Sequence, residues 1–571
     1  MKKTVLFLGL LILQFSYAQK LTETQKLATT CKVWGFLKYY HPQVASGKFN
    51  WDDQLFSVLP KIEQASTKEE FSKILENWID SLGDVKKIAP IKDSDTVKYF
   101  YKNLDLAWLD KTTYFSKKVS EKLEFIKNNR HQGKQYYVYL DIDSENASDG
   151  IHTQNEIHYS DFKWDNKDLR ILTLFKYWNI IEYFYPNKYL LDQKWDTSFT
   201  DIISKFLICD SEKQFHETVG ELISKISDSH SHYFPEYKEL KMGNNFLPVD
   251  FKFIDNKMVV TKILNDSVAK LNDLKLGDAI VSVDKKLISD LISENRNKVF
   301  GSNEAAYLSN LSLKYRRFLN EKIEVEFLRD AKKINKIIEL YSAHDFFRDH
   351  DKKPIEKYKI LENNIGYVDI TRNLDRVIDE MLIKLKTTKA IVVDLRGYPM
   401  RESANEIAKF INAKAKPYAK STSPDLSYPG RYFWSKPFLL EASKDSYKGK
   451  IVVLVNELTQ SWSETIAMQL KTSENTIVIG SQTSGADGAG TGIEIMKGVD
   501  TEITGVGFYY PDGKEVQRVG IVPDIEVKQT IEGIKLGKDE ILDKAIEFIE
   551  IGKKEDLIIP LKLSKINKLK L

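Results

Sequence analysis

Serine and glutamate residues near the end of the 571-residue chain have the spacing of a hydrolytic or a helix-capping motif. Ser461 follows the apolar run KIVVLV and precedes a helical pattern. A serine at such a strand-to-helix turn lies beside free backbone N–H groups and the positive end of a helix, which could stabilise a developing oxyanion. The structural alternative is a capping box formed with Glu464, and most serines with this spacing only cap helices.

A histidine-containing segment, DSHSH at 228–232, offers a general base. An imidazole with a pKa of about 6.5 suits removal of a serine proton near neutral pH. By itself His230 would more often be structural than catalytic. His232 alternates with it and is expected to point elsewhere. Because neither cysteine nor a clear third ligand lies nearby, we predict no metal site and no cofactor.

An internal duplication shows which part of the chain carries the DSHSH segment. KVWGFLKYYHP at 32–42 and KYWNIIEYFYP at 176–186 align at an offset of 144 residues, and at the same offset the Trp-Asp pair at 51–52 meets another at 195–196. The pattern predicts a repeated helical unit whose first helices end before proline. From a shared aspartate onward, the first copy reads DVK at 84–86 and the second reads DSHSH at 228–232. Only one copy therefore carries imidazoles, which is a first indication of function.

Alternating strands and helices are expected from about residue 363. IGYVDI, AIVVDLRG, KIVVLVNE and NTIVIGS are apolar runs of strand length, and helical patterns lie near 375–388, 402–413 and 462–472. This order predicts an α/β domain with a parallel-rich sheet and crossover helices. Ligands bind at the carboxyl ends of such strands, where Ser461 also lies.

Residues 243–342 form a predicted small β-rich unit. The order strand, strand, Gly-Asp, strand, helix, strand resembles a PDZ domain, and Gly-Asp-Ala-Ile at 277–280 matches that family. PDZ domains bind extended peptides at a sheet edge. LPVDF at 247–251 occupies the carboxylate-binding loop but lacks the family's usual glycines, which argues against carboxylate capture there. The alternative is an inert spacer.

The N-terminus has the pattern of a secretory signal. Lys2 and Lys3 precede an apolar stretch at 5–13, and Ser16 and Ala18 place small residues at the −3 and −1 positions of a cleavage site after Ala18. An N-terminal anchor is the alternative. No later run reaches the roughly 18 apolar residues of a membrane helix. We therefore expect an exported protein, periplasmic or extracellular, that is soluble after signal removal and has no peripheral membrane association.

Charge and cysteine content exclude other classes. The chain has 85 Lys+Arg and 82 Asp+Glu, and signal removal leaves 83 against 82, so no nucleic-acid partner is predicted. Cys31 and Cys209 are too few for a disulfide scaffold or a zinc cluster. Both lie in helical patterns and are expected to be buried small apolar residues, although a single bridge between them stays open.

Taken together, the motifs resemble those of the C-terminal-processing (tail-specific) serine peptidases, especially their tricorn-core-like branch, over roughly residues 166–530. The supporting motifs are DSH at 228–230, LGD at 276–278, DLRG at 394–397, SxxE at 461–464, GxxTxG at 480–485 and GIVPD at 520–524. Each is weak alone, and their order and spacing make the match specific.

The resemblance implies roles for the serine and its neighbours. Ser461 matches the nucleophile, with Ser463 as the less favoured alternative. The backbone N–H of Trp462 would form half of the oxyanion hole. The second donor would come from Gly397, although the family commonly continues this loop with Asn-x-Gly-Gly where the chain has Tyr-Pro-Met at 398–400.

The general base is also assigned by resemblance. The processing peptidases use a lysine at the position of Ala486, so a Ser-Lys dyad is not expected here. The tricorn-like branch uses a histidine preceded by a serine, matched by His230 and Ser229, together with a downstream glutamate. Gln517 stands at the glutamate position and would hold geometry without charge. Glu515 or Asp512 nearby are alternatives for that role.

The predicted organisation follows from these segments. It comprises a signal at 1–18, a degenerate helical repeat at 19–165, the second repeat at 166–242, the PDZ-like unit at 243–342, the catalytic domain at 355–530 and a helical extension at 531–571. The predicted function is that of an exported serine endopeptidase acting on protein or peptide substrates. The alternative is a catalytically inactive peptide-binding scaffold. The helical repeats are candidates for interaction or dimerisation, which leaves a homo-oligomer open.

Overall fold

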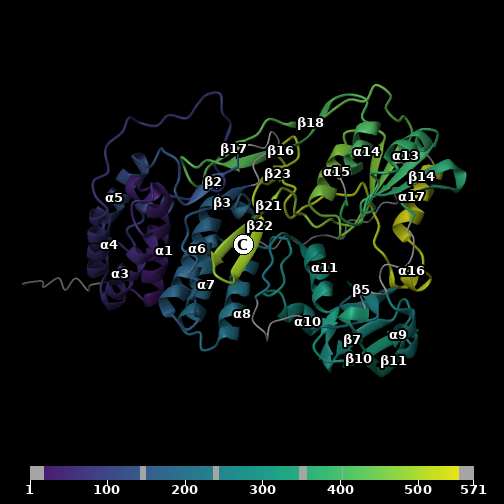
Figure 1. Ribbon diagram of the computed structural model, residues 1–571, viewed down its shortest axis with the longest axis horizontal. Coiled ribbons are helices and arrows are strands. Elements are labelled where there is room, and N and C mark those ends of the chain that lie inside the picture. Colours follow the sequence, from purple (N-terminus) through teal and green to yellow (C-terminus); the bar gives the residue numbers. More distant parts are fainter. Residues whose placement is uncertain (1–18, 142–149, 236–242, 346–355, 401–402, 552–571) are drawn as a thin grey trace, which may run out of the picture.

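The computed structural model describes residues 19–141, 150–235, 243–345, 356–400 and 403–551 (Figure 1). The predicted signal at 1–18 lies outside the described residues. Within the described part of the chain, none of the helices combines the length and the apolar character needed to cross a membrane. Helical repeats occupy one end of the molecule, and the α/β domain and the β-rich unit occupy the other (Figure 1).

Both copies of the duplicated sequence fold into helices. The first copy comprises α1 (Glu23–Tyr40), α2 (Pro42–Ala45), α3 (Trp51–Gln64) and α4 (Lys68–Ser81), and the second comprises α6 (Lys167–Phe184), α7 (Trp195–Leu207) and α8 (Glu212–Ser224). The long helices α1 and α6 end just before Pro42 and Pro186, because the residue before proline is disfavoured in helical geometry. The first copy is extended by α5 (Lys117–Asn128).

The tryptophans that marked the duplication make the same contacts in each copy. The Trp34 indole donates to the Trp51 carbonyl at 3.3 Å, and the Trp51 indole donates to the Trp34 carbonyl at 3.1 Å. Trp178 and Trp195 repeat the exchange at 3.4 and 3.0 Å. Their rings stack with centroids 6.3 Å apart in the first copy and 6.1 Å apart in the second. The aromatic residues are therefore core residues in both copies.

Ion pairs cross between the copies in a reciprocal way. Lys32 of the first copy lies 2.5 Å from Asp196 of the second, and Lys176 of the second lies 3.1 Å from Asp52 of the first. Each lysine and each aspartate is separated from its counterpart by the same 144 residues. Such an exchange is the contact pattern of two units related by an approximate two-fold axis. Between the copies, Asn179 donates to the carbonyl of Cys31, and both Cys31 and Cys209 are free thiols.

The tight contact between α1 and α6 predicts opposite effects for two glycine substitutions. A Cβ on Gly35 would lie 1.7 Å from the buried Asn179 Oδ1, whereas a Cβ on Gly220 in α8 would meet only Tyr233 at 3.5 Å. We expect Gly35→Ala to lower the free energy of unfolding by about 1–3 kcal/mol through overpacking. Gly220→Ala should raise it by up to about 1 kcal/mol through helix propensity. Urea unfolding followed by tryptophan fluorescence measures both, and equal effects would contradict the packing.

A six-stranded sheet forms the centre of the α/β domain. Its order is β13 (Tyr358–Leu361), β14 (Ile365–Asp369), β15 (Ala390–Asp394), β19 (Lys450–Val455), β20 (Thr476–Gly480) and β24 (Ile525–Glu526). All neighbours from β14 to β24 pair in parallel, and β13 pairs antiparallel at the edge.

Helices cover both faces of this sheet. Alternate residues such as Ile451 and Val453 pack toward α13 (Ile378–Leu385), α14 (Ser403–Ile411) and α15 (Trp462–Leu470). The intervening residues Val452 and Leu454 pack toward α17 (Glu540–Ile551). Because both faces are buried, the strands are continuous apolar runs, and β19 delivers its carboxyl end to the turn that carries Ser461.

The β-rich unit is an antiparallel sheet with short helices. Its strands lie in the order β11 (Lys332–Glu339), β10 (Lys322–Arg329), β7 (Ala279–Val283), β6 (Lys257–Ile263) and β5 (Val249–Ile254), with α11 (Glu304–Lys314) packed against β5. The predicted Gly-Asp turn has Gly277 at φ +82°, a conformation that favours glycine, and Asp278 forms two 2.7 Å hydrogen bonds with Arg329. Its identity as a PDZ domain stays a prediction.

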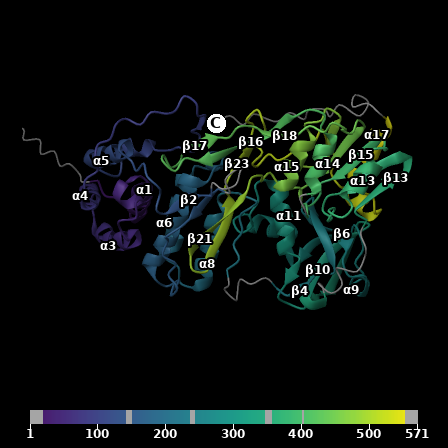
Figure 2. The same ribbon diagram turned by 45° about the horizontal axis from the view of Figure 1, so that its top comes forward.

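Two β structures connect the helical repeats to the α/β domain (Figure 2). β1 (Tyr99–Phe100) of the first repeat pairs with β17 (Tyr432–Trp434), which continues through β16 (Lys416–Pro424) to β23 (Gly507–Tyr509). The hairpin of β21 (Gly490–Met496) and β22 (Val499–Thr504) buries Ile493, Val499 and Ile503 in the helical core. This hairpin therefore brings residues of the α/β domain to the end of α8, where His230 follows.

Candidate active site

Ser461 lies at a sharp strand-to-helix turn. β19 ends at Val455, and α15 begins at Trp462, directly after the serine. Ser461 has φ 54° and ψ −119°, a combination that is strained for a residue with a side chain. Its backbone N–H donates to the Ala486 carbonyl at 3.0 Å, and the residue is half-buried. The turn thus holds a serine at the N-terminal end of a helix, the geometry of a nucleophile elbow.

A buried glutamate fixes this turn. The Glu464 carboxylate accepts hydrogen bonds from the Thr483 hydroxyl at 2.5 Å and from the backbone N–H groups of Gly485, Ala486 and Ser461 at 2.9, 3.1 and 3.2 Å. Burial raises its pKa to about 7, while these donors act in the opposite direction. Glu464 therefore ties the loop after β20 to the serine turn, which is more than the local capping that its spacing suggested.

The two candidate serines differ in environment. Ser463 is fully buried, and its hydroxyl donates to the Gly397 carbonyl at 2.5 Å. This bond holds the loop after β15 against the first turn of α15. A side chain at Gly397 would lie 2.5 Å from the Thr371 methyl group. Trp462 is the first residue of α15, so its backbone N–H has no acceptor within the helix. Gly397 therefore lies next to the first turn of α15, which begins with Trp462.

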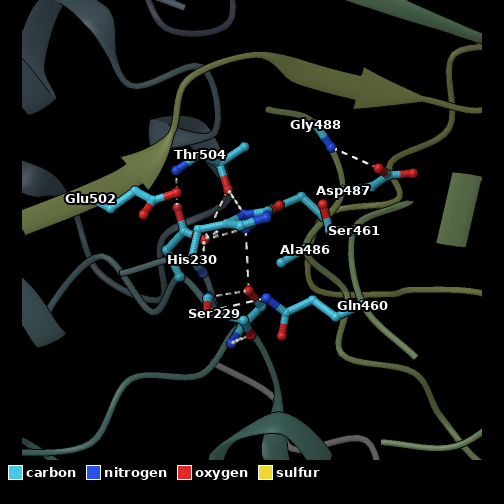
Figure 3. Close-up of polar contacts among 12 residues, drawn as sticks. Ser229, His230, Gln460, Ser461, Ala486, Asp487, Gly488, Glu502 and Thr504 are labelled. Carbon is cyan, nitrogen blue, oxygen red and sulfur yellow. Dashed lines mark hydrogen bonds and ion pairs between the residues drawn. The ribbon is translucent and has the colours of Figure 1, made fainter. Parts of the chain in front are cut away.

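His230 lies in the loop that follows α8, and polar contacts fix it (Figure 3). Its backbone N–H donates to Asp228 Oδ1 at 3.0 Å, and its Nδ1 lies 2.9 Å from Thr504 Oγ1. The Thr504 hydroxyl also contacts Asp228 Oδ1 at 2.9 Å. Among the described residues, no hydrogen bond is made to Nε2 of the imidazole, which leaves this nitrogen available.

Gln460, the residue before the serine, connects the histidine loop to the serine turn. Its Nε2 donates to the Ser229 carbonyl at 3.4 Å, and its Oε1 accepts from the Ser484 hydroxyl at 2.9 Å. The Ser229 hydroxyl lies 3.4 Å from the Ser484 carbonyl. The structure therefore brings the two predicted loops together. In the part of the chain that the structure describes, the Ser461 hydroxyl makes no hydrogen bond to the imidazole, and such bonds are often long before substrate binds.

Gln517 lies near the histidine loop without touching the imidazole. Its Nε2 is 3.5 Å from Asp228 Oδ1 and 3.3 Å from Ser302 Oγ. The two alternative carboxylates pair elsewhere: Glu515 lies 2.8 Å from Lys102, and Asp512 lies 2.9 Å from Lys514. Neither is therefore a neighbour of the imidazole in this arrangement.

His232 has different surroundings from His230. Its side chain is 42% exposed, against 10% for His230, and its Nδ1 lies 3.7 Å from Glu502. Over the described ranges, no three His, Cys, Asp or Glu side chains are grouped as metal ligands would be. The two imidazoles thus occupy separate environments.

Sequence reasoning missed the residues that other segments contribute. Thr504 comes from the end of β22 and contacts His230 across 274 positions of sequence. Ser302 comes from the β-rich unit and exchanges hydrogen bonds of 2.9 and 2.8 Å with Ser229. From the same segment, Asn303 donates to the Thr483 carbonyl at 2.9 Å. No linear motif marks these residues, because their roles depend on long-range packing.

Comparisons with known proteins give a family for part of the chain. Residues 364–527 match the model of peptidase family S41. A carboxy-terminal-processing protease of Bartonella bacilliformis is 23% identical over 357 residues, covering 59% of this chain and 75% of its own length. The carboxy-terminal processing protease CtpA of Bacillus subtilis is 22% identical over 334 residues, covering 56% and 65%.

The fold also matches a solved structure. Mature CPAF complexed with lactacystin superposes with a TM-score of 0.53 at 12% identity, covering 68% of this chain and 99% of that one. At this identity the match concerns the fold alone, and it extends beyond the 364–527 segment. The chain is therefore a homologue of the carboxy-terminal-processing proteases, a serine-type peptidase whose residues 364–527 form a peptidase family S41 domain.

Proposed function

We propose that the chain is an exported serine endopeptidase in which Ser461 is the nucleophile and His230 the general base. The observation that carries the proposal is the contact between the Gln460-Ser461 turn and the Ser229-His230 loop, made through Gln460. Positive φ at Ser461 and the free Nε2 of His230 support the same roles. The sequence pattern at 1–18 supports export.

In the first half of the reaction, the Ser461 oxygen attacks the carbonyl carbon of the scissile peptide bond. His230 Nε2 takes the hydroxyl proton as the new C–O bond forms. The carbonyl oxygen gains negative charge, and the backbone N–H groups of Trp462 and Gly397 donate to it. The imidazolium then gives its proton to the leaving amine, and an acyl-enzyme with an ester at Ser461 remains.

In the second half, water releases the acyl group. His230 removes a proton from the water as it attacks the ester carbon, and the same backbone donors hold the oxyanion. The proton returns to the Ser461 oxygen, and a peptide with a new carboxylate leaves. With Ala486 at the position where a lysine base would lie, the chain relies on the imidazole for proton transfer in both halves of the reaction.

The β-rich unit is proposed to be PDZ-like and to present an extended peptide to the site. β5 lies at one edge of its sheet beside α11, the arrangement into which a peptide strand can pair. Its Ser302 and Asn303 reach the histidine loop and the loop after β20, so this unit also supports the site directly. Relatives that are named carboxy-terminal-processing proteases support a protein substrate.

Labelling with a fluorophosphonate tests the activated serine. The reagent forms a covalent adduct only with a serine whose hydroxyl is activated by a base. We expect one adduct per chain, mapped by mass spectrometry to the peptide that contains Ser461. The matched control is the same protein unfolded in urea, which should not react. An intact fold that resists labelling while binding peptide would instead favour the inactive scaffold.

A further inference from the structure

A buried carboxylate, that of Asp228, lies beside the proposed base. Asp228 is fully buried, and His230 Nδ1 lies 3.8 Å from its Oδ1. Among the described residues, His230 is the one basic side chain within 4 Å of this carboxylate. A buried carboxylate is costly unless it is paired or well hydrogen-bonded. The imidazolium that forms during proton transfer would therefore meet a fixed negative charge.

Donors from several segments surround Asp228. Its Oδ1 accepts from the His230 backbone and the Thr504 hydroxyl, and its Oδ2 accepts from the Thr504 backbone N–H at 2.7 Å. The Tyr185 phenol faces the same carboxylate, and its pKa is raised by burial and by this neighbour. The carboxylate is thus held rigidly between α6, the histidine loop and β22.

The hydroxyl of Thr504 has a single proton, and the contacts determine where it points. Its oxygen lies 2.9 Å from both Asp228 Oδ1 and His230 Nδ1. An ionised carboxylate can only accept, so the threonine proton must point to Asp228. The threonine oxygen then accepts from Nδ1–H. This fixes the imidazole tautomer with Nε2 unprotonated, which is the form that a general base requires.

Gln517 fits this arrangement better than a glutamate would. Its amide Nε2 is directed to Asp228 Oδ1 at 3.5 Å and to Ser302 Oγ at 3.3 Å. An amide donor at this place favours the charged carboxylate. A carboxylate at 517 would put a second negative charge beside Asp228, in a region where both groups are buried.

We propose that Asp228, acting through the hydroxyl of Thr504, is the charge that orients His230 and stabilises its protonated form. Thr504 and Asp228 are positioning residues, because neither touches the reacting atoms. The inference rests on the proposed role of His230 as the base. The sequence placed the group that supports the histidine at Gln517. In this proposal that role belongs to a two-residue relay, which consists of Asp228 from the second helical repeat and Thr504 from β22.

Thr504→Val tests the relay, because valine keeps the shape of the threonine side chain and removes its hydroxyl. We expect Thr504→Val to lower kcat on dye-quenched casein by about 10–100-fold with KM within about threefold. Thr504→Ser restores the hydroxyl and should stay within about threefold of the wild type. Thr501→Val is the matched control on the same strand, since Thr501 is also buried but its hydroxyl bonds the His232 carbonyl.

Labelling rates separate this relay from the proposed function. A wild type that does not label at Ser461 contradicts the proposed function and the relay together. Normal labelling and kcat in Thr504→Val, or equal losses in the valine and serine variants, would overturn the relay alone. Gln517→Glu is expected to lower the labelling rate, and a gain in rate would assign the charge to position 517 instead.

Discussion

Ser461→Ala should lower kcat for casein hydrolysis by about 10⁴-fold or more and abolish fluorophosphonate labelling. The expectation follows from the loss of the attacking oxygen, since removing one member of a serine–histidine pair leaves only the catalysis that oxyanion donors and binding provide. Substrate binding should persist, because the Trp462 helix turn and the Gly397 loop are unchanged. The hydrolysis rate of dye-quenched casein measures the loss of kcat. Fluorescence anisotropy measures whether peptide binding persists.

Ser463→Ala is the matched control for the nucleophile. Ser463 is two residues away and fully buried, and its hydroxyl already donates to the Gly397 carbonyl. Losing that bond should loosen the Gly397 loop and lower kcat by about tenfold or less, while labelling at Ser461 continues. The assignment of the nucleophile is wrong if Ser463→Ala abolishes labelling and Ser461→Ala does not.

Much of the fold could be predicted from residue patterns. The strands β14, β15, β19 and β20 are runs of β-branched and aliphatic residues, because helices bury both faces of their sheet. The duplicated helices are marked by tryptophans that make the same backbone contacts in each copy. The turn that carries Ser461 could also be predicted, because its position after an apolar strand depends on the local sequence.

The supporting residues could not be predicted, because they depend on how distant segments pack. Thr504 reaches His230 only because the β21–β22 hairpin buries Ile493 and Ile503 among the helices. Ser302 contacts Ser229 from the β-rich unit, and nothing in its own segment marks it. The resemblance to the family placed Gln517 at the position of a charged group, and its amide lies 3.5 Å from the Asp228 carboxylate, which no motif marked for that role.

His230→Ala should lower kcat by about 10³-fold or more, the second large effect that the site predicts. Nε2 is the atom proposed to take the serine proton, and without it the Ser461 hydroxyl remains a weak nucleophile. The fluorophosphonate labelling rate should fall by a similar factor, because the same proton transfer limits that reaction. KM should change little, since the imidazole is 10% exposed and makes its contacts with Asp228 and Thr504.

Added imidazole and the neighbouring histidine separate a chemical role from a structural one. The alanine variant leaves a space of imidazole size next to Thr504, so free imidazole should restore part of the labelling rate in a concentration-dependent way. His232→Ala is the matched control, because its side chain is 42% exposed and lies near Glu502 rather than Thr504. We expect that variant to stay within about threefold of the wild type. Equal losses for both histidines, without rescue by imidazole, would mean that the loop is structural and that the base lies elsewhere.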